Sequence, residues 1–320
     1  MISRIFGAAG ILCTLITAAL AADDFPAKPL KIILPLAPGA SADAVTRIFS
    51  DEVSKDLGQP IMVEPRPGGG GSIGLNTFLR EPHDGYSLLF MDSSMYASLA
   101  AQAKKLGIDI TKEVQGLTAF SSSPQVVATP TDRPFNSIVD LLNASVNTAE
   151  GYSYGTQFPG GPAQILGHML VSETSAKARL VTYSGSAQYT MDLVAGRLDF
   201  GVNAYSAFKP HVASGALKVL AVATEGRLHN LPEVPTLREL GLPHTTLYFG
   251  LVTHADVDPK IVEKLNAAFV KAGQKPEIQA WLIERDILPE EMTAQAYGEA
   301  LDTQAAIQRE AIQAALGLTN

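Results

Sequence analysis

Apolar residues in this chain occur in two patterns, as short runs and as longer segments in which they recur three and four residues apart. The run at 31–36 predicts a buried strand, and the spacing over 41–57 predicts an amphipathic helix. Strands at 61–64 and 87–91 follow, with a helix over 72–80 between them. Strands that alternate with helices in this way favour a parallel sheet.

A second series of strands and helices begins after Pro124 and ends before a proline-rich stretch at 231–243. Its predicted strands lie at 125–128, 152–154, 180–183, 199–202 and 219–223, and its predicted helices at 137–144, from Pro162 and at 186–195. These elements are enough for a second lobe with its own sheet.

The end of the chain predicts a strand at 248–252 and three helical segments that start near Pro259, Pro276 and Thr293. One strand cannot easily form a third core, so this tail should return to the first lobe. The predicted fold is therefore α/β with two lobes, each a mainly parallel sheet flanked by helices.

The return of the tail makes the chain cross twice between the lobes, near 123–125 and 247–249, which predicts a double-crossing hinge. Lobe 1 would comprise residues 22–124 and 247–320, and lobe 2 residues 125–246.

The first 21 residues have the pattern of a secretory signal peptide, because Arg4 precedes an uninterrupted apolar run that ends in small residues at Ala21. A retained membrane anchor is the alternative, although the run is shorter than the roughly 20 residues that a spanning helix prefers. The single cysteine, Cys13, lies in this run, so cleavage after Ala21 leaves a chain with no thiol chemistry and no disulfide. We expect export to the periplasm.

Composition narrows the possible partners. The chain has 320 residues, 46% of them hydrophobic, and a net charge of −8, which fits a globular protein and argues against binding of nucleic acid or anionic lipid. Its six histidines show no spacing typical of a zinc site. We therefore expect a small-molecule partner, with no metal and no cofactor.

Three glycine-containing loops stand where a strand is followed by a helix, at 38–41, 67–72 and 156–162. Helix N-termini present unpaired N–H groups and can hold an anion without a charged side chain. Open α/β sheets bind ligands at these carboxyl-end crevices. Ordinary turn glycines are the alternative for any one loop, but three loops over two lobes favour an anion-binding cleft.

The middle loop also contains two enzyme motifs. Gly69, Gly71 and Gly74 match the dinucleotide-binding spacing, with Asp92 where a ribose-binding acid would stand. Ser72 lies in a G-x-S-x-G nucleophile-elbow pattern. Prolines interrupt the first motif, and several loop residues separate the strand from Ser72. A serine hydrolase and a dehydrogenase therefore remain alternatives to a binding protein.

Many short motifs, in order along nearly the whole chain after residue 25, make it resemble the periplasmic substrate-binding proteins of tripartite tricarboxylate transporters, the Bug receptors. They are Pro26-Ala27-Lys28-Pro29, Pro38-Gly39 with Asp43 and Arg47, Leu57-Gly58-Gln59-Pro60, Val63-Glu64, Arg66-Pro67-Gly68, Asp84-Gly85-Tyr86, Tyr183-Ser184-Gly185-Ser186-Ala187, Gly196 with Asp199, Leu231-Pro232-Glu233-Val234-Pro235-Thr236 and Gly241-Leu242-Pro243. The resemblance implies a non-catalytic, monomeric receptor with the periplasmic-binding-protein fold, which closes on a carboxylate and delivers it to membrane permease subunits.

The resemblance also implies which positions hold the ligand carboxylate, one set on each side of the cleft. They are Leu36, Pro38, Gly39, Ala40 and Ser41 in the first lobe and Thr156, Gln157, Phe158, Gly160 and Gly161 in the second. We add Gly71, Ser93, Tyr96, Ser184, Asn203 and Tyr205 as further candidates around the same cleft.

Several positions depart from the family pattern and bear on the ligand. Ala40 replaces a glycine, Gln164 replaces a histidine, and Asn203 stands where many members carry an acid. Phe158, with Tyr96 and Tyr205 as expected neighbours, could cover an aromatic ring. The sequence therefore favours an aromatic carboxylate over small aliphatic di- and tricarboxylates.

Overall fold

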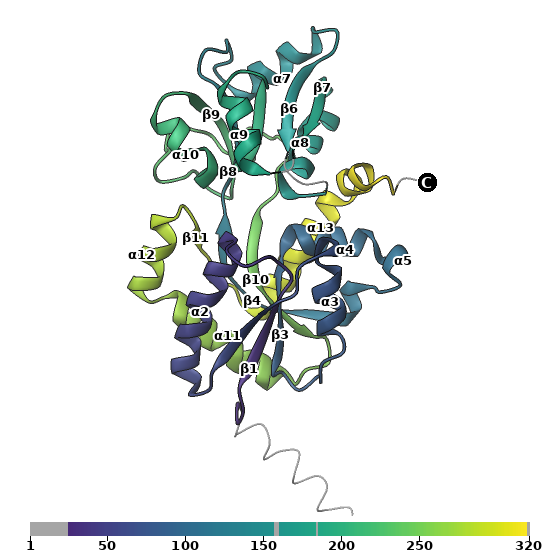
Figure 1. Cartoon of the computed structure of the whole chain (residues 1–320), viewed down its shortest axis with the longest axis vertical. Coiled ribbons are helices and arrows are strands. Elements are labelled where there is room, and N and C mark those ends of the chain that lie inside the picture. Colours follow the sequence, from purple (N-terminus) through teal and green to yellow (C-terminus); the bar gives the residue numbers. More distant parts are fainter. Residues whose placement is uncertain (1–24, 157–159, 184, 319–320) are drawn as a thin grey trace, which may run out of the picture.

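The computed structural model describes residues 25–156, 160–183 and 185–318, which form two lobes stacked along the long axis of the molecule (Figure 1). Each lobe contains one sheet with helices on its faces. Within the described residues, no helix is both long enough and apolar enough to cross a membrane. The two-lobed α/β architecture predicted from the sequence is confirmed.

Lobe 1 is built on a six-stranded sheet whose spatial order is β11-β4-β10-β3-β1-β2. Its strands are β1 (Leu30–Leu34), β2 (Ile61–Pro65), β3 (Ser87–Asp92), β4 (Val114–Ser123), β10 (Leu247–His254) and β11 (Leu288–Pro289). Its helices are α2 (Ser41–Leu57), a 3-10 turn at Gly69–Gly71, α3 (Ser72–Phe78), α4 (Ser93–Ala101), α5 (Ala103–Leu106), α6 (Ile110–Glu113), α11 (Pro259–Gly273), α12 (Pro276–Glu284) and α13 (Ala294–Leu316).

Lobe 2 is built on a five-stranded sheet whose spatial order is β7-β6-β8-β5-β9. Its strands are β5 (Gln125–Pro130), β6 (Tyr152–Thr156), β7 (Ala178–Thr182), β8 (Phe200–Ala204) and β9 (Leu217–Ala223). Its helices are α7 (Ile138–Val146), α8 (Pro162–Ser172), α9 (Ser186–Val194) and α10 (Tyr205–Ala213).

Both sheets are mixed, which corrects the expectation of mainly parallel sheets. In lobe 1, β1 is parallel to β2 and β3, whereas β10 is antiparallel to both β3 and β4. In lobe 2, β6 is parallel to its neighbours, and β5 is antiparallel to β8 and β9. The reason lies in the crossings: β4 leaves lobe 1 and β10 returns to it beside β4, so the two strands must run in opposite directions.

The alternating pattern of β1 and β3 gives lobe 1 two apolar layers, one on each face of the sheet. Ile32 and Phe90 face the layer that contains α2 and α11, and Ile33 and Leu89 face the layer that contains α3 and α13. All four side chains are buried. β4 could not be predicted from the sequence, because its second half contains only alanine and serine apart from Phe120 and lacks an apolar pattern.

Two glycines shape the core of lobe 2 around one aromatic ring. Tyr189 of α9 packs over Gly155 and Gly201, and a Cβ atom at either glycine would collide with its ring. The Tyr189 hydroxyl donates a hydrogen bond of 3.0 Å to the carbonyl of Val202. This pairing requires glycine on the two neighbouring strands β6 and β8.

A third connection joins the lobes on one side of the hinge. α13 begins against lobe 1, and its last turns reach α8 of lobe 2 (Figure 1). There Ile312 packs with Ile165 and Met169 of α8 and with Ala97 of α4. The tail does return to lobe 1, but its final helix also bridges both lobes.

A polar contact joins the lobes on the other side. The Lys209 ammonium of α10 lies 2.9 Å from the Asp286 carboxylate, which follows α12, and the Asn230 amide donates to the same carboxylate at 3.2 Å. The strands that cross between the lobes, β4–β5 and β10, therefore lie between the apolar contact around Ile312 and the ion pair of Lys209 with Asp286.

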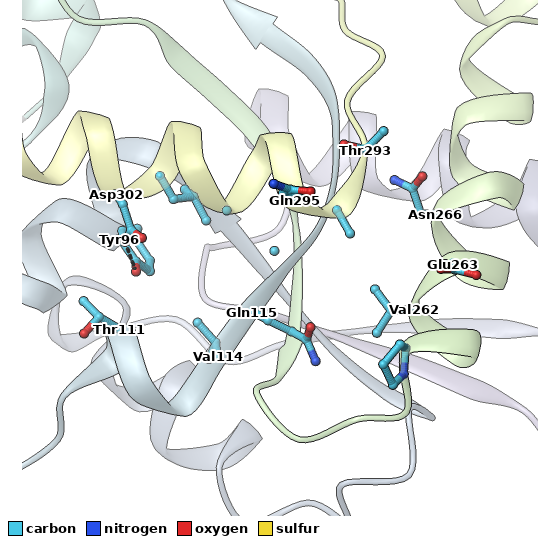
Figure 2. A pocket seen from close by; sticks show the side chains of 15 residues that line it. Tyr96, Thr111, Val114, Gln115, Val262, Glu263, Asn266, Thr293, Gln295 and Asp302 are labelled. Atoms are coloured by element: carbon cyan, nitrogen blue, oxygen red, sulfur yellow. Dashed lines mark hydrogen bonds between the residues drawn. The ribbon is translucent and has the colours of Figure 1, made fainter.

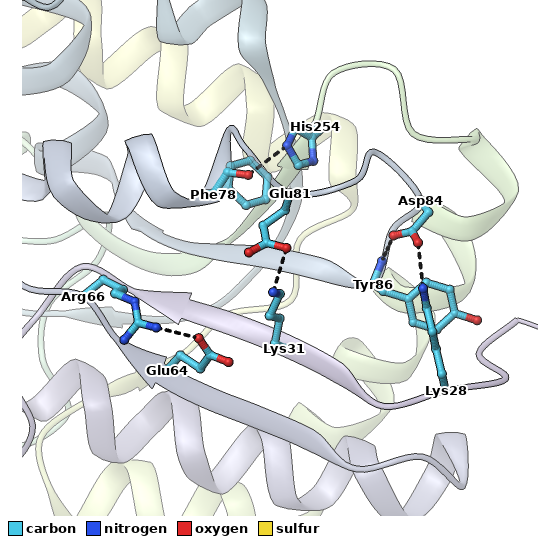
Figure 3. A network of polar contacts seen from close by, with 9 residues as sticks. All are labelled: Lys28, Lys31, Glu64, Arg66, Phe78, Glu81, Asp84, Tyr86 and His254. Atoms are coloured by element: carbon cyan, nitrogen blue, oxygen red, sulfur yellow. Dashed lines mark hydrogen bonds and ion pairs between the residues drawn. The ribbon is translucent and has the colours of Figure 1, made fainter.

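Several family-motif residues lie at the end of lobe 1 that faces away from lobe 2 (Figures 1 and 3). The Lys28 ammonium lies 2.9 Å from the Asp84 carboxylate, which also accepts the Tyr86 N–H at 3.1 Å. Gly85 between them adopts a φ of +79°, and a Cβ there would collide with Ile261. Asp84, Gly85 and Tyr86 therefore form a turn just before β3, and Lys28 binds to it.

We predict that Ile312→Ala destabilises the protein by about 2–5 kcal/mol, because it removes a fully buried side chain between α13, α8 and α4. Ile307→Ala on the same helix is the matched control, since Ile307 is 41% exposed and should cost less than about 0.5 kcal/mol. Chemical unfolding of both variants checks this. Equal losses would contradict the bridging role of Ile312.

Candidate functional site

A cavity of about 490 Å³ lies between the lobes, at the carboxyl ends of β1, β2 and β3 and the N-terminus of α8. Its wall combines backbone from glycine loops of both lobes with polar side chains from one face of α4. The lining residues are Pro35, Leu36, Gly68, Gly69, Gly70, Gly71, Asp92, Ser94, Met95, Ser98, Gln102, Lys105, Gly160, Gly161, Pro162 and Leu316.

The glycine loop of lobe 1 has a backbone that only glycine adopts readily. Gly68, Gly69, Gly70 and Gly71 have φ values of +120°, +59°, +62° and +97°. A Cβ at Gly71 would also collide with the Met95 side chain. The four glycines thus let the main chain form the cavity wall directly, with its peptide groups in place of side chains.

The α4 wall presents hydroxyl and amide groups one turn apart. Ser94, Ser98 and Gln102 recur at four-residue intervals and all line the cavity. The Ser94 side chain is only 4% exposed, and its hydroxyl has no hydrogen-bond partner in the described part of the chain. This wall could not be predicted from the sequence, because a serine-containing helix with little apolar periodicity gives no clear signal.

Asp92 ends β3 and caps α4, and its Oδ1 accepts the Met95 N–H at 2.7 Å. Burial raises the pKa of this carboxyl to about 6, although the backbone N–H groups of Met95 and Ser94 act to lower it. Lys105 is the other ionisable residue in the cavity wall. No ion pair links Lys105 to another residue that the structure describes.

Lobe 2 contributes the first turn of α8. Gly160 and Gly161 precede Pro162, which occupies the first helical position. The Gly160 N–H donates to the Gln164 side-chain oxygen at 2.7 Å. Gln164 is the position where the sequence comparison expected a histidine. Its side chain accepts the Gly160 N–H, so this backbone donor next to the cavity is already used.

Four of the positions expected to hold the ligand line this cavity, namely Leu36, Gly71, Gly160 and Gly161. Gln157, Phe158 and Ser184 lie outside the described residues. Thr156 is 1% exposed at the end of β6, and its hydroxyl has no partner in the described part of the chain.

The loop at 38–41 lies at the surface and does not line the cavity. The N–H of Gly39, expected to bind an anion, donates to the Asp43 carboxylate at 2.9 Å. Arg47 pairs with the same carboxylate at 2.8 Å. Asp43 thus binds two other members of its own motif, Gly39 and Arg47, at the start of α2. Pro38, Ala40 and Ser41 are exposed beside them.

The two tyrosines expected near an aromatic ligand point elsewhere. The Tyr96 hydroxyl donates to Asp302 at 2.7 Å, at a separate cavity of about 670 Å³ that lies within lobe 1 between α11 and α13 (Figure 2). Tyr205 is buried in a core cluster of lobe 2. Neither lines the interlobe cavity, so the expected aromatic neighbours of Phe158 are absent from its described wall.

Ser93 and Asn203 are buried in polar contacts. The Ser93 hydroxyl donates to the Thr246 carbonyl at 2.8 Å and accepts from the Tyr248 N–H at 3.2 Å, which ties α4 to the returning hinge strand. The Asn203 amide donates to the Ser186 hydroxyl at 3.0 Å and accepts the Ala204 N–H at 2.9 Å. Neither residue lines the cavity.

The two enzyme motifs of the glycine loop lack the contacts that catalysis or dinucleotide binding would need. Ser72 begins α3, and no hydrogen bond in the described part of the chain joins its hydroxyl to a histidine or a carboxylate. Asp92, considered as a ribose-binding acid, accepts N–H groups of its own helix. The described residues contain no group of three histidine, cysteine or acidic side chains placed to hold a metal.

We predict that wild type loses stability as the pH rises through about 6, and that Asp92→Asn does not show this loss. Because the folded-state pKa of about 6 lies above the usual 3.8, the Asp92 proton stabilises the fold at low pH, and this contribution is lost as pH rises through about 6. The variant should therefore gain up to about 3 kcal/mol relative to wild type between pH 4 and pH 7.

Urea unfolding at several pH values measures this difference. Asp132→Asn, a change at an exposed carboxyl of lobe 2, is the control and should show no such trend. A difference between Asp92→Asn and wild type that stays constant with pH would contradict the prediction.

Comparison with known proteins identifies the family. Residues 45–318 match the model of the tripartite tricarboxylate transporter family receptor, TctC. The chain is 30% identical to the UPF0065 protein in the gbd 5′ region of Cupriavidus necator over 87% of this chain and 84% of that protein. It is 28% identical to protein BugT of Bordetella pertussis over 82% of each.

The fold is that of solved members of the same group. A TctC solute-binding protein from Polaromonas, crystallised without ligand, superposes with a TM-score of 0.82 at 21% identity, over 91% of this chain and 99% of that one. The resemblance read from the short sequence motifs is thus confirmed, and the chain belongs to the receptor family of tripartite tricarboxylate transporters.

Proposed function

We propose that this protein is a periplasmic receptor that captures a small organic carboxylate in the interlobe cavity and delivers it to the permease subunits of a tripartite tricarboxylate transporter. The observation that carries the proposal is the wall of the 490 Å³ cavity, to which glycine-rich backbone of both lobes contributes. A volume of this size suits a small molecule. The receptor would be exported with cleavage of its leader, act as a monomer and catalyse no reaction.

The electrostatics of the cavity support an anionic ligand. The α8 N-terminus directs the positive end of its helix dipole towards the cavity. Lys105 adds a positive charge that forms no ion pair within the described part of the chain. Asp92 opposes this attraction when ionised, so the carboxylate of the ligand should lie on the side of the glycine loops and Lys105.

The class of carboxylate remains a prediction. The aromatic preference now depends on Phe158 alone, because Tyr96 and Tyr205 do not line the cavity. Among proteins of the same fold, MatC of Rhodopseudomonas palustris has malate bound, at 22% identity and a TM-score of 0.71, and another protein of that species is solved with adipate, at 22% identity and 0.73. Malate and adipate therefore belong in the test panel beside aromatic acids.

We predict that the purified protein binds at least one acid from a calorimetric panel of malate, adipate, citrate, benzoate and terephthalate. Binding should stabilise the native state by about 2.7 kcal/mol at a ligand concentration of 100 Kd, which a thermal melt detects. Ester hydrolysis by wild type that disappears in Ser72→Ala would contradict the receptor and support the hydrolase alternative.

We predict that Lys105→Glu weakens binding of the tightest acid at low salt by roughly fivefold or more, because the reversal replaces an attraction with a repulsion at the cavity rim. Lys104→Glu is the matched control, since Lys104 lines only the neighbouring surface pocket. Titrations at low and high salt measure both variants. Equal effects of the two reversals would place the ligand outside this cavity.

A further inference from the structure

We propose that the ligand carries, beside its carboxylate, a hydroxyl or ammonium group that donates a hydrogen bond at Asp92 and Ser94. The inference rests on the proposed function and concerns the same cavity. It names the substrate class more closely, as carboxylates with a hydrogen-bond donor near the acid group.

Ser94 provides the first observation. Its side chain is 4% exposed and lies in the cavity wall, and its hydroxyl has no partner in the described part of the chain. A buried hydroxyl without a hydrogen-bond partner destabilises the protein, so such groups normally have a partner. A polar ligand atom at this point of the cavity would supply the missing partner.

Asp92 provides the second observation. Its Oδ1 accepts the Met95 N–H at 2.7 Å, which uses part of the roughly four acceptor sites of a carboxylate. The rest of this side chain borders the cavity and belongs to the same β3–α4 junction as Ser94. An ionised carboxylate can only accept hydrogen bonds, so it favours a ligand group that donates one.

The charge of Asp92 disfavours binding of the ligand carboxylate next to it. A ligand carboxylate beside ionised Asp92 would be repelled, because like charges at short range in a partly buried site are weakly screened. Lys105 stands on α5, beyond the end of α4 that is remote from Asp92. The cavity therefore has two sides. The side of Lys105 favours the ligand carboxylate, and the side of Asp92 and Ser94 favours a ligand group that donates a hydrogen bond.

Three series of acids test this, each with a parent acid and its 2-hydroxy and 2-amino forms. They are succinate, malate and aspartate; adipate, 2-hydroxyadipate and 2-aminoadipate; and phenylacetate, mandelate and phenylglycine. In calorimetry, a donor-bearing acid should bind at least about tenfold more tightly than its parent in one series, as expected for a hydrogen bond to a charged group. The hydroxy and amino forms distinguish the two donors.

Three variants assign the effect to the residues. Ser94→Ala and Asp92→Asn should each reduce the advantage of the donor-bearing acid by about tenfold, and Asp92→Asn should also improve binding of the parent acid. Asn can still accept the Met95 N–H, so the cap of α4 is kept. Ser121→Ala is the matched control, because Ser121 is another buried serine of lobe 1 without a hydroxyl partner in the described part of the chain and does not line the cavity.

If a variant fails to fold, the pH dependence of ligand binding by the wild-type protein tests the inference instead. The donor advantage should be largest above pH 6 and shrink below it, because protonation removes the charge of Asp92. The other ionisable groups that bear on Asp92 are Lys105, at the opposite side of the cavity, and the buried Tyr297, whose pKa burial raises well above this range.

The outcomes separate this inference from the proposed function. Parent and donor-bearing acids that bind equally in every series, or an advantage that survives in both Ser94→Ala and Asp92→Asn, would overturn the inference and leave the receptor intact. Binding of none of the nine acids, with binding of citrate, benzoate or terephthalate, would overturn the inference alone. Binding of none of these twelve acids would overturn both.

Discussion

The antiparallel pairing of β4 with β10 is the constraint on which the architecture depends. Leu247 pairs with Ser123 and His254 with Val114, so the strands that leave and enter lobe 1 lie side by side along their whole length. This pairing makes the lobe 1 sheet mixed, holds the two crossings together and leaves the carboxyl ends of β1, β2 and β3 facing lobe 2. The interlobe cavity is a direct consequence of that orientation.

The fold could be predicted where local pattern decides the structure. The β1 run and the apolar spacing of α2 identify a βα unit, and the lone strand of the tail correctly indicates a return to lobe 1. Strand direction was not predictable, because β4 consists largely of small and hydroxyl residues that are buried by tertiary packing. The bridging role of α13 depends on Ile312 meeting α8, a contact without a local signal.

Of the candidate site, only the glycine-rich backbone could be predicted from the sequence. Glycine signals a special main-chain conformation, so the sequence alone places Gly71, Gly160 and Gly161 at a strand-to-helix crevice. Side-chain orientation around a helix end depends on packing, so Tyr96 was expected in the cleft whereas Ser94, two residues earlier, lines it. The Gly39 loop shows the converse, since an anion-binding amide can be satisfied by the chain's own carboxylate.

Amide hydrogen exchange with the tightest-binding carboxylate tests the central claim most directly, because a cavity of about 670 Å³ within lobe 1 lies apart from the interlobe cavity and involves other segments. The account predicts that ligand slows exchange in segments of both lobes, at 68–75 and 94–102 in lobe 1 and at 160–166 in lobe 2. Protection confined to 111–116, 259–266 and 293–302, which surround the cavity within lobe 1, would contradict it.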